Sequence, residues 1–184
     1  MTGAGAADQT GPVPEPPTKT EAIARLRDGH DRVGRAVDRL SPDDLDRPGL
    51  GGKTWSPKDL LGHLTSWEEY ALAALGAWRQ RSPAPIDVAL RTKGLNEVNA
   101  EAVTAKAQRP AADVRQDFEA VHDELLGAIR AIADEAWILP ATPRMRRPLA
   151  EKIGAILGGP GGWFRHAEAH LPDIEAFAAE HGTP

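Results

Sequence analysis

The stretch SPKDLLGHLTSWEEYALAALGAWR, residues 56–79, decides the fold of this chain. It opens with a helix cap, Ser56, a proline suited to the first helical position, Pro57, and an acid that favours the positive end of the helix dipole, Asp59. Apolar side chains then recur at steps of three and four: Leu60, Leu64, Trp67, Ala71, Ala74 or Leu75, and Trp78. We therefore predict one long amphipathic helix.

Similar periodicity extends through the rest of the chain. Residues 18–40 and 114–132 each carry one apolar stripe at helical spacing, and residues 95–108 and 163–177 are further helical segments. Residues 41–45 have the composition of a short capped turn. No segment shows the sustained alternation of a strand. We predict an all-α protein, an up-down-type four-helix bundle with extra short helices.

The composition is that of one globular domain with a disordered N-terminal tail. Hydrophobic residues make up 41% of the 184 and charged residues 27%, which is ordinary for a globular protein. Residues 1–17 consist mostly of Gly, Ala, Thr and Pro and hold too little apolar surface to offset the entropy of ordering. We predict a tail at 1–17 and a bundle domain at 18–184.

Charge and hydropathy restrict the expected partners. A net charge of −5 gives no electrostatic reason for nucleic-acid binding, so we predict none. No apolar run reaches membrane-spanning length and no signal peptide is visible, which predicts no membrane partner and a cytoplasmic location. The chain has no cysteine, which removes disulfides and thiolate ligands. Monomer and homodimer both remain open.

Two histidines near the C-terminus have the spacing of metal ligands. His166 and His170 are four residues apart, which on a helix places both rings on one face roughly 6 Å apart along the axis. Two imidazoles so placed can hold one divalent cation. Pro172 leaves two possibilities, because a proline either kinks this helix or begins it, and only the kinked helix keeps the pair stacked.

A third ligand has to come from another helix. His63 lies on the apolar face of residues 56–79, and it is either that ligand or a buried neutral histidine bonded to a carbonyl. His30 and His122 lie on or beside apolar stripes, and we interpret both as structural histidines. Glu68, at the polar edge, is a solvated acid or an acceptor for a metal-bound histidine.

Two motifs carry a resemblance to a known family. The resemblance is to the DinB-like (YfiT-like) superfamily of four-helix bundles, and it lies in WSPKDLLGHLTSWE at residues 55–68 and HAEAHLPDI at residues 166–174. Within that superfamily, both segments are similar in sequence to the ClbS/DfsB group. That resemblance implies His63, His166 and His170 as a three-histidine site for zinc, nickel or a similar divalent ion. Its members include mycothiol-dependent isomerases and bacillithiol-type S-transferases, and the ClbS/DfsB group includes a self-resistance protein.

Two functional hypotheses follow. The first is a metal-dependent enzyme acting on a small electrophile, by hydrolysis or by transfer of an external low-molecular-weight thiol, in detoxification or self-resistance. The second is a metal-free protein that binds or sequesters a small molecule for self-protection. Trp55, Trp67, Trp78 and Trp163 either wall an apolar pocket above the metal or belong to the bundle core. As substrate-binding residues we predict Trp67, Asn99 and Trp163.

Overall fold

The computed structural model describes residues 15–50, 54–140 and 147–183. Within these residues the chain is helical, and extended pairing is limited to isolated bridges. The helices are α1 (Lys19–Val37), α2 (Pro42–Leu45), α3 (Pro57–Arg79), α4 (Pro85–Lys93), α5 (Leu95–Ala107), α6 (Ala111–Arg130), α7 (Asp134–Trp137), α8 (Leu149–Ile156) and α9 (His166–His181). The all-α prediction, with short helices beside long ones, is confirmed.

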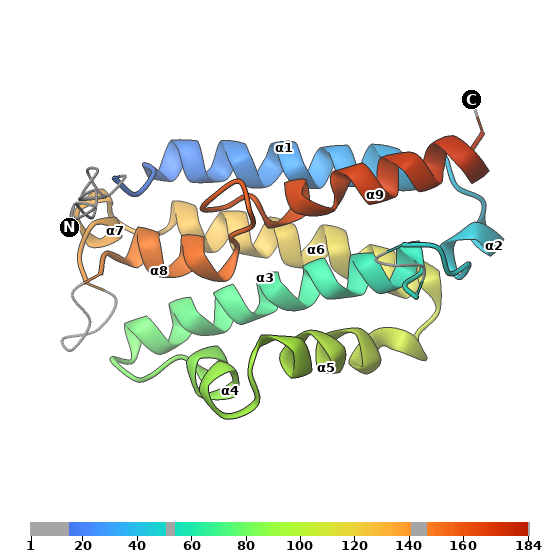
Figure 1. Ribbon diagram of the computed structural model, residues 1–184. Helices are drawn as coiled ribbons and strands as arrows, with labels where there is room; N and C mark the ends of the chain where they lie inside the picture. Colours follow the sequence, from blue (N-terminus) through green and yellow to red (C-terminus); the bar gives the residue numbers. More distant parts are fainter. Residues whose placement is uncertain (1–14, 51–53, 141–146, 184) are drawn as a thin grey trace, which may run out of the picture.

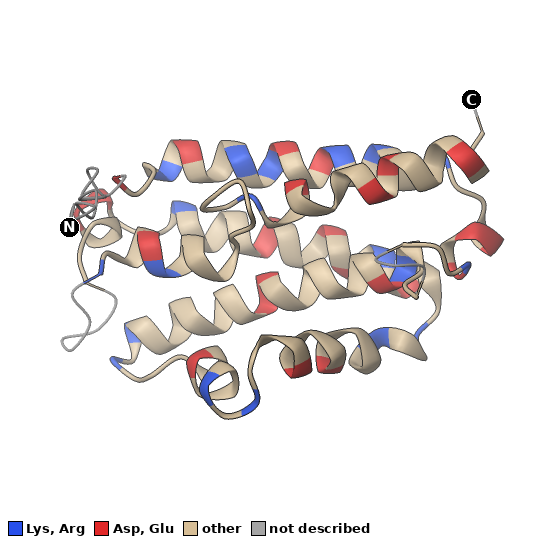
Figure 2. Cartoon of the chain, in the orientation of Figure 1, with Lys and Arg blue, Asp and Glu red and all other residues tan. Residues whose placement is uncertain are grey.

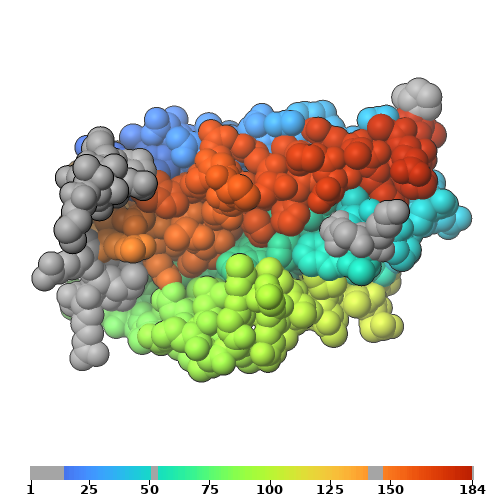
Figure 3. All heavy atoms as spheres, in the orientation of Figure 1, coloured from blue at the N-terminus to red at the C-terminus, as the bar shows by residue number. Residues whose placement is uncertain are grey.

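The long helices α1, α3, α6 and α9 form the bundle (Figure 1). α3 packs on α6, α1 packs along α9 and contacts α6, and α5 covers the outer side of α3. α1 and α9 run in one direction and α3 and α6 in the other, and α5 runs back between α3 and α6, which are therefore parallel. On the face drawn in Figure 3, the surface of α9 meets the N-terminal half of α3.

The predicted start of α3 is the observed one. Ser56 caps the helix: its hydroxyl accepts from the backbone N–H of Asp59, and the Asp59 carboxylate accepts in return from the N–H of Ser56. Pro57 occupies the first turn, where no backbone donor is lost. This reciprocal cap fixes the register of α3 from its first residue, and with the register it fixes which side chains face the bundle.

The last helix runs through its proline. α9 begins at His166 and contains Pro172 in its interior, so the alternative in which the helix starts at the proline is wrong. The segment before α9 is anchored by the backbone: Phe164 N–H donates to the Gly154 carbonyl at 3.3 Å, and His166 N–H donates to the Leu157 carbonyl at 3.0 Å. His166 and His170 therefore occupy successive turns of one helix.

A layer of buried histidines separates two apolar clusters of the core. One cluster, at the α7–α8 end, includes Trp67, Trp137 and Phe164, and the other, at the α2 end, includes Leu60 and Phe177. On α1 and α6 the chain passes from one cluster to the other across His30 and His122, whereas His63 on α3 and His166 and His170 on α9 lie at the edge of the second cluster, close to Trp67 and Phe164 of the first. The bundle thus carries a polar layer in its core. Apolar packing would be expected there, because buried polar groups are costly unless they are paired.

The surface shows mixed charge. Figure 2 shows acidic and basic residues interspersed along α1 and the other outer faces. Among the described helices none is long and apolar enough to cross a membrane. Most of the predicted tail at residues 1–17 lies outside the described residues, but its last residue, Pro17, is buried and its carbonyl accepts a 2.9 Å hydrogen bond from the Trp137 indole.

Candidate metal centre

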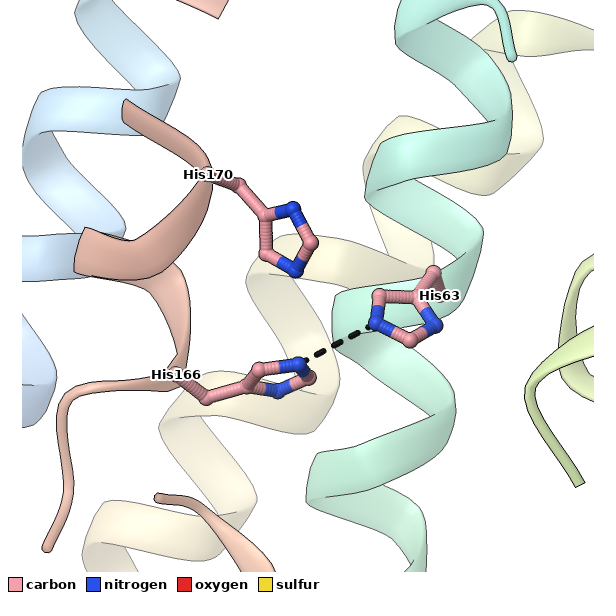
Figure 4. Close-up of side chains that lie close together, drawn as sticks. All are labelled: His63, His166 and His170. Atoms are coloured by element: carbon pink, nitrogen blue, oxygen red, sulfur yellow. Dashed lines mark hydrogen bonds between the residues drawn. The ribbon is translucent and has the colours of Figure 1, made fainter. Parts of the chain in front are cut away.

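Three histidines from two helices meet in the polar layer (Figure 4). His63 comes from α3, and His166 and His170 come from α9. One nitrogen of each ring lies within 4.8 Å of the others, and the Nε2 atoms of His63 and His166 are 3.1 Å apart. The ring centroids are 4.9 to 5.3 Å apart and every pair is edge-on rather than stacked. This arrangement lets the in-plane lone pairs of all three rings converge on one point.

Burial keeps these rings neutral. Loss of hydration lowers the pKa of His63 to about 3, with the neighbouring His170 adding to the effect. The pKa of His166 is held well below its usual value by burial and by the two other rings. Burial also lowers the pKa of His170, opposed by the Asp173 carboxylate. Neutral imidazole is the form that binds a metal ion, so protonation does not compete for these lone pairs at neutral pH.

The three rings have few other partners. Among the described residues, the hydrogen bond between His63 and His166 is the only one that they make, and the buried Nδ1 of His63 has no partner. A buried polar atom without a partner is costly and needs an explanation. The donor set of three neutral nitrogens fits zinc or nickel. His63, His166 and His170 are therefore the residues that would hold such an ion.

Small residues bring the helices close enough for this geometry. A side chain at Gly29 of α1 would lie 3.0 Å from the Cβ atom of Ala167, so glycine permits the close packing of α1 on the first turn of α9. On α3, a side chain at Gly62 would meet the stem of Lys106 from α5 at 3.2 Å. The glycine before His63 thus lets α5 press on the outer face of α3, opposite the ring.

A pocket opens beside the histidines. It has a volume of about 230 Å³ and is lined by Leu50, Trp55, Leu60, His170 and Asp173. The Trp55 ring lies 4.9 Å from that of His63, centroid to centroid, and 6.3 Å from that of His170. His170 is thus the histidine that faces the pocket. Trp55 is one of the tryptophans expected from the sequence to wall a pocket, whereas Asp173 was not named as a site residue, although it lies three residues after His170.

The residues predicted to bind substrate lie at different distances from the metal centre. The Trp67 ring is 5.6 Å from that of His166 and 6.3 Å from that of His63, so Trp67 packs beside these two rings. Asn99 accepts a 3.1 Å hydrogen bond from the Trp67 indole and supports it from behind. Trp163 packs against the α7–α8 end of the core and makes no ring contact with the three histidines.

The remaining buried histidines form a second group. His30 and His122 bond to Glu119 and Glu68 respectively, each at 2.9 Å, so both have structural partners as interpreted. Glu68, considered above as an acceptor for a metal-bound histidine, accepts from His122 instead of from the three-histidine site. One further histidine, His181, lies against Phe177 near the end of α9.

Solved structures share this fold at low sequence identity. An uncharacterised protein from Escherichia coli UTI89 superimposes with a TM-score of 0.74 and 13% identity, over 91% of this chain and 95% of that one. The colibactin self-resistance protein ClbS, solved in complex with double-stranded DNA, gives 0.67 and 11% over 91% and 97%. A Streptococcus pneumoniae protein gives 0.59 and 13% over 91% and 88%. No curated protein sequence matches the chain.

The structure of ClbS with double-stranded DNA corrects one prediction. We excluded nucleic acid on net charge alone, and that exclusion is wrong for this fold, since a protein with the same architecture has been solved in complex with DNA. Net charge sums the whole chain and does not describe the local surface that meets a phosphate backbone.

A family model completes the comparison. The model of the mycothiol maleylpyruvate isomerase N-terminal domain matches residues 26–156, which is more than half of the chain. The match includes His63 and ends before the pair on α9. The fold comparisons extend the likeness over 91% of the chain. The chain belongs to the mycothiol maleylpyruvate isomerase N-terminal domain family, within the DinB-like superfamily.

Proposed function

We propose that this protein is a divalent-metal-dependent enzyme that acts on a small electrophilic molecule, by transferring an external thiol or by hydrolysis. The observation that carries the proposal is the convergence of three neutral imidazoles, one buried and two half-buried, beside an open pocket. Three protein ligands leave at least one position of a zinc ion open. A bound ion would lower the pKa of a water or thiol that reaches that position.

The chain's own residues define the rest of the chemistry. With no cysteine present, a thiol nucleophile has to enter from outside. Trp55 and Leu60 give the pocket an apolar wall, and His170 and Asp173 place polar atoms in it. Such a pocket suits a small molecule with one apolar part and one polar end. Trp67, held in place by Asn99, closes the side next to His166.

Metal content and a conjugation assay test this proposal. Protein purified without a tag should carry zinc or nickel, and the zinc-loaded form should accelerate conjugation of a low-molecular-weight thiol, or hydrolysis, with a panel of small electrophiles. His170→Ala, which removes the ligand facing the pocket, should abolish the acceleration. An isolated protein without metal that shows no metal-dependent turnover would contradict the proposal.

A second candidate is self-resistance by binding a reactive small molecule without metal. Its support is the fold likeness to ClbS, a colibactin self-resistance protein, together with the apolar wall of the pocket. The same metal-stripped protein distinguishes the two candidates. Binding of an electrophile that survives removal of zinc and the His63→Ala change favours this second function. Gel shifts with double-stranded DNA should accompany the experiment, because ClbS was solved in complex with it.

A further inference from the structure

A second cluster of potential ligands lies across the bundle from the three-histidine site. It consists of His30 on α1, Glu68 on α3 and His122 on α6, with one ligand atom of each within 4.8 Å of the others. His30 and His122 are 6% and 4% exposed, and the Glu68 side chain is 12% exposed. The cluster shares no residue with the first site. Any function that it has is therefore independent of the function proposed above.

Each residue of this cluster keeps one buried atom without a partner. These atoms are Nδ1 of His30, Nε2 of His122 and Oε2 of Glu68. The other polar atom of each side chain is engaged, because His30 Nε2 bonds to Glu119 and His122 Nδ1 bonds to the Oε1 atom of Glu68. A carboxylate that orients a histidine while the second ring nitrogen stays free is the usual support of a metal ligand.

The negative charge of Glu68 also favours a bound cation in this cluster. Among the described residues, the only ion pair that Glu68 makes is with His122. Burial of a carboxylate is costly unless a cation compensates it. Glu119 adds a second negative charge on the outer side of His30, and the Arg115 guanidinium lies 3.8 Å from the Glu119 carboxylate. On the inner side, Arg25 lines the same cavity as His30 and Glu68, and its guanidinium donates to the Trp163 carbonyl rather than to Glu68.

Space for an ion exists at the same place. A cavity of about 20 Å³, room for one water molecule or ion, is lined by His30 and Glu68 and extends to Phe118 and His166. We propose that His30, Glu68 and His122 form a second, independent binding site for a divalent cation. Two imidazoles and a carboxylate are a donor set that zinc and other first-row divalent ions accept.

The rings must move for this site to fill. His30 stacks on His122 with centroids 3.8 Å apart and planes 15° from parallel, and its other face stacks on Phe118. Two stacked rings cannot both direct an in-plane lone pair at one ion, so one ring turns about its Cβ–Cγ bond on loading. Because this stack has to open, the second site should bind an ion more weakly than the three-histidine site.

Zinc titration in a background without the first site tests the proposal. In His63→Ala/His170→Ala, calorimetry should detect one remaining zinc site. Adding Glu68→Gln, which keeps the size of the side chain and removes its charge, should abolish it. Glu119→Gln should weaken it by about 10- to 100-fold, as expected for loss of an orienting carboxylate. Glu69→Gln is the matched control, because Glu69 pairs with Lys106 outside the cluster, and it should leave zinc binding unchanged.

A measurement on the unaltered protein removes any dependence on variant folding. Anomalous diffraction from zinc-soaked wild-type crystals should give two peaks per chain, one of them among His30, Glu68 and His122, with the two rings no longer stacked. A single peak at the three-histidine site, or a Glu68→Gln variant that binds zinc as tightly as its parent, would overturn the second site.

Discussion

The two histidine clusters of the polar layer use the same residue type in opposite ways. In the first, His63, His166 and His170 lie edge-on to one another beside a pocket, and their one mutual hydrogen bond leaves most ring nitrogens unclaimed. In the second, His30 and His122 stack face to face, and each is bonded to a carboxylate. Orientation and charge, rather than the number of histidines, separate the site that we propose to bind metal as it stands from the one that would have to rearrange.

The contrast also shows how the bundle can contain a polar layer without a large loss of stability. A buried imidazole is less costly than a buried charge as long as it stays neutral, and in the first cluster burial, with a smaller effect of the neighbouring rings, keeps the pKa of His63 and His166 low. The second cluster carries the Glu68 carboxylate and depends on its bond to His122. Each cluster therefore responds differently to metal, acid and mutation, and the following experiments use that difference.

The largest expected effect is the loss of metal-dependent stability. Zinc at about 100 times its Kd should raise the free energy of unfolding of the wild type by about 2.7 kcal/mol. The reason is that zinc binds the folded protein and not the unfolded chain, in which the three ligands are far apart. His63→Ala should lose most of that increment, and adding His170→Ala should cost little more, since the ligands act as a unit. Chemical denaturation with zinc and with chelator measures this. Variants that keep the full increment would place zinc elsewhere.

The control for this experiment is His181→Ala. Its ring lies against Phe177 and belongs to neither cluster, so the zinc increment should be unchanged. His30 and His122 do not serve as controls, because both are buried and contribute to the second cluster.

Acid should destabilise the metal-free protein. Burial lowers the pKa of His63 to about 3, while the same group in the unfolded chain titrates near ~6.5. The unfolded chain therefore takes up the proton first, so stability is full above pH ~6.5 and falls as the pH drops below it. Each such histidine contributes up to about 1.4 kcal/mol per pH unit.

Urea denaturation in chelator between pH 8 and pH 5 measures the effect, and His63→Ala should give a shallower slope than wild type. Burial also lowers the pKa of His30, opposed by its bond to Glu119, so the second cluster should contribute in the same direction. Stability that does not change over this range would contradict the neutral, buried state of the rings.

A glycine pair tests how α9 is held in place. A side chain at Gly154 would lie 2.7 Å from the Phe164 ring and 2.9 Å from Trp163, in the segment that leads into α9. Gly154→Ala should cost about 1–3 kcal/mol and weaken zinc binding by shifting His166. Gly76→Ala is the matched control: it lies within α3 with nothing within 4 Å, and should stabilise by about 0.5–1 kcal/mol. Equal effects from both changes would rule out the anchoring role.

The smallest effect is expected for deletion of the N-terminal residues. Deleting residues 1–14 should leave the thermal midpoint nearly unchanged, as their composition suggests. Deleting residues 1–17 also removes the Pro17 carbonyl that accepts from the Trp137 indole, and should cost about 1–3 kcal/mol. A large drop for the shorter deletion would show that residues 1–14 contribute to packing.

The sequence predicted those features whose signal is local. The cap and first turn of α3 lie within four residues of one another, and His166 and His170 are one helical turn apart, so periodicity and spacing were sufficient. The prediction of His63 as third ligand depended on its apolar face and on the family resemblance. α4 was missed, because the two prolines before it, Pro83 and Pro85, indicated only a break in the chain.

Features that depend on contacts between helices were beyond sequence analysis. His30, Glu68 and His122 come from three helices and are separated by 38 and 54 residues, so no spacing rule links them. Trp55 reaches the pocket only because α9 packs against α3. Which face of a helix carries a histidine can be predicted from its pattern, but its neighbours on other helices are determined by packing.

Calorimetric titration with zinc and nickel tests the central claim most directly. It requires metal-free wild type, the three single variants His63→Ala, His166→Ala and His170→Ala, and the control His181→Ala, all at neutral pH where burial keeps the rings unprotonated. Wild type and the control should share one tight binding step, and each of the three variants should lose it. Wild type that binds neither ion, or a His63→Ala variant that binds as tightly as wild type, would contradict the three-histidine site.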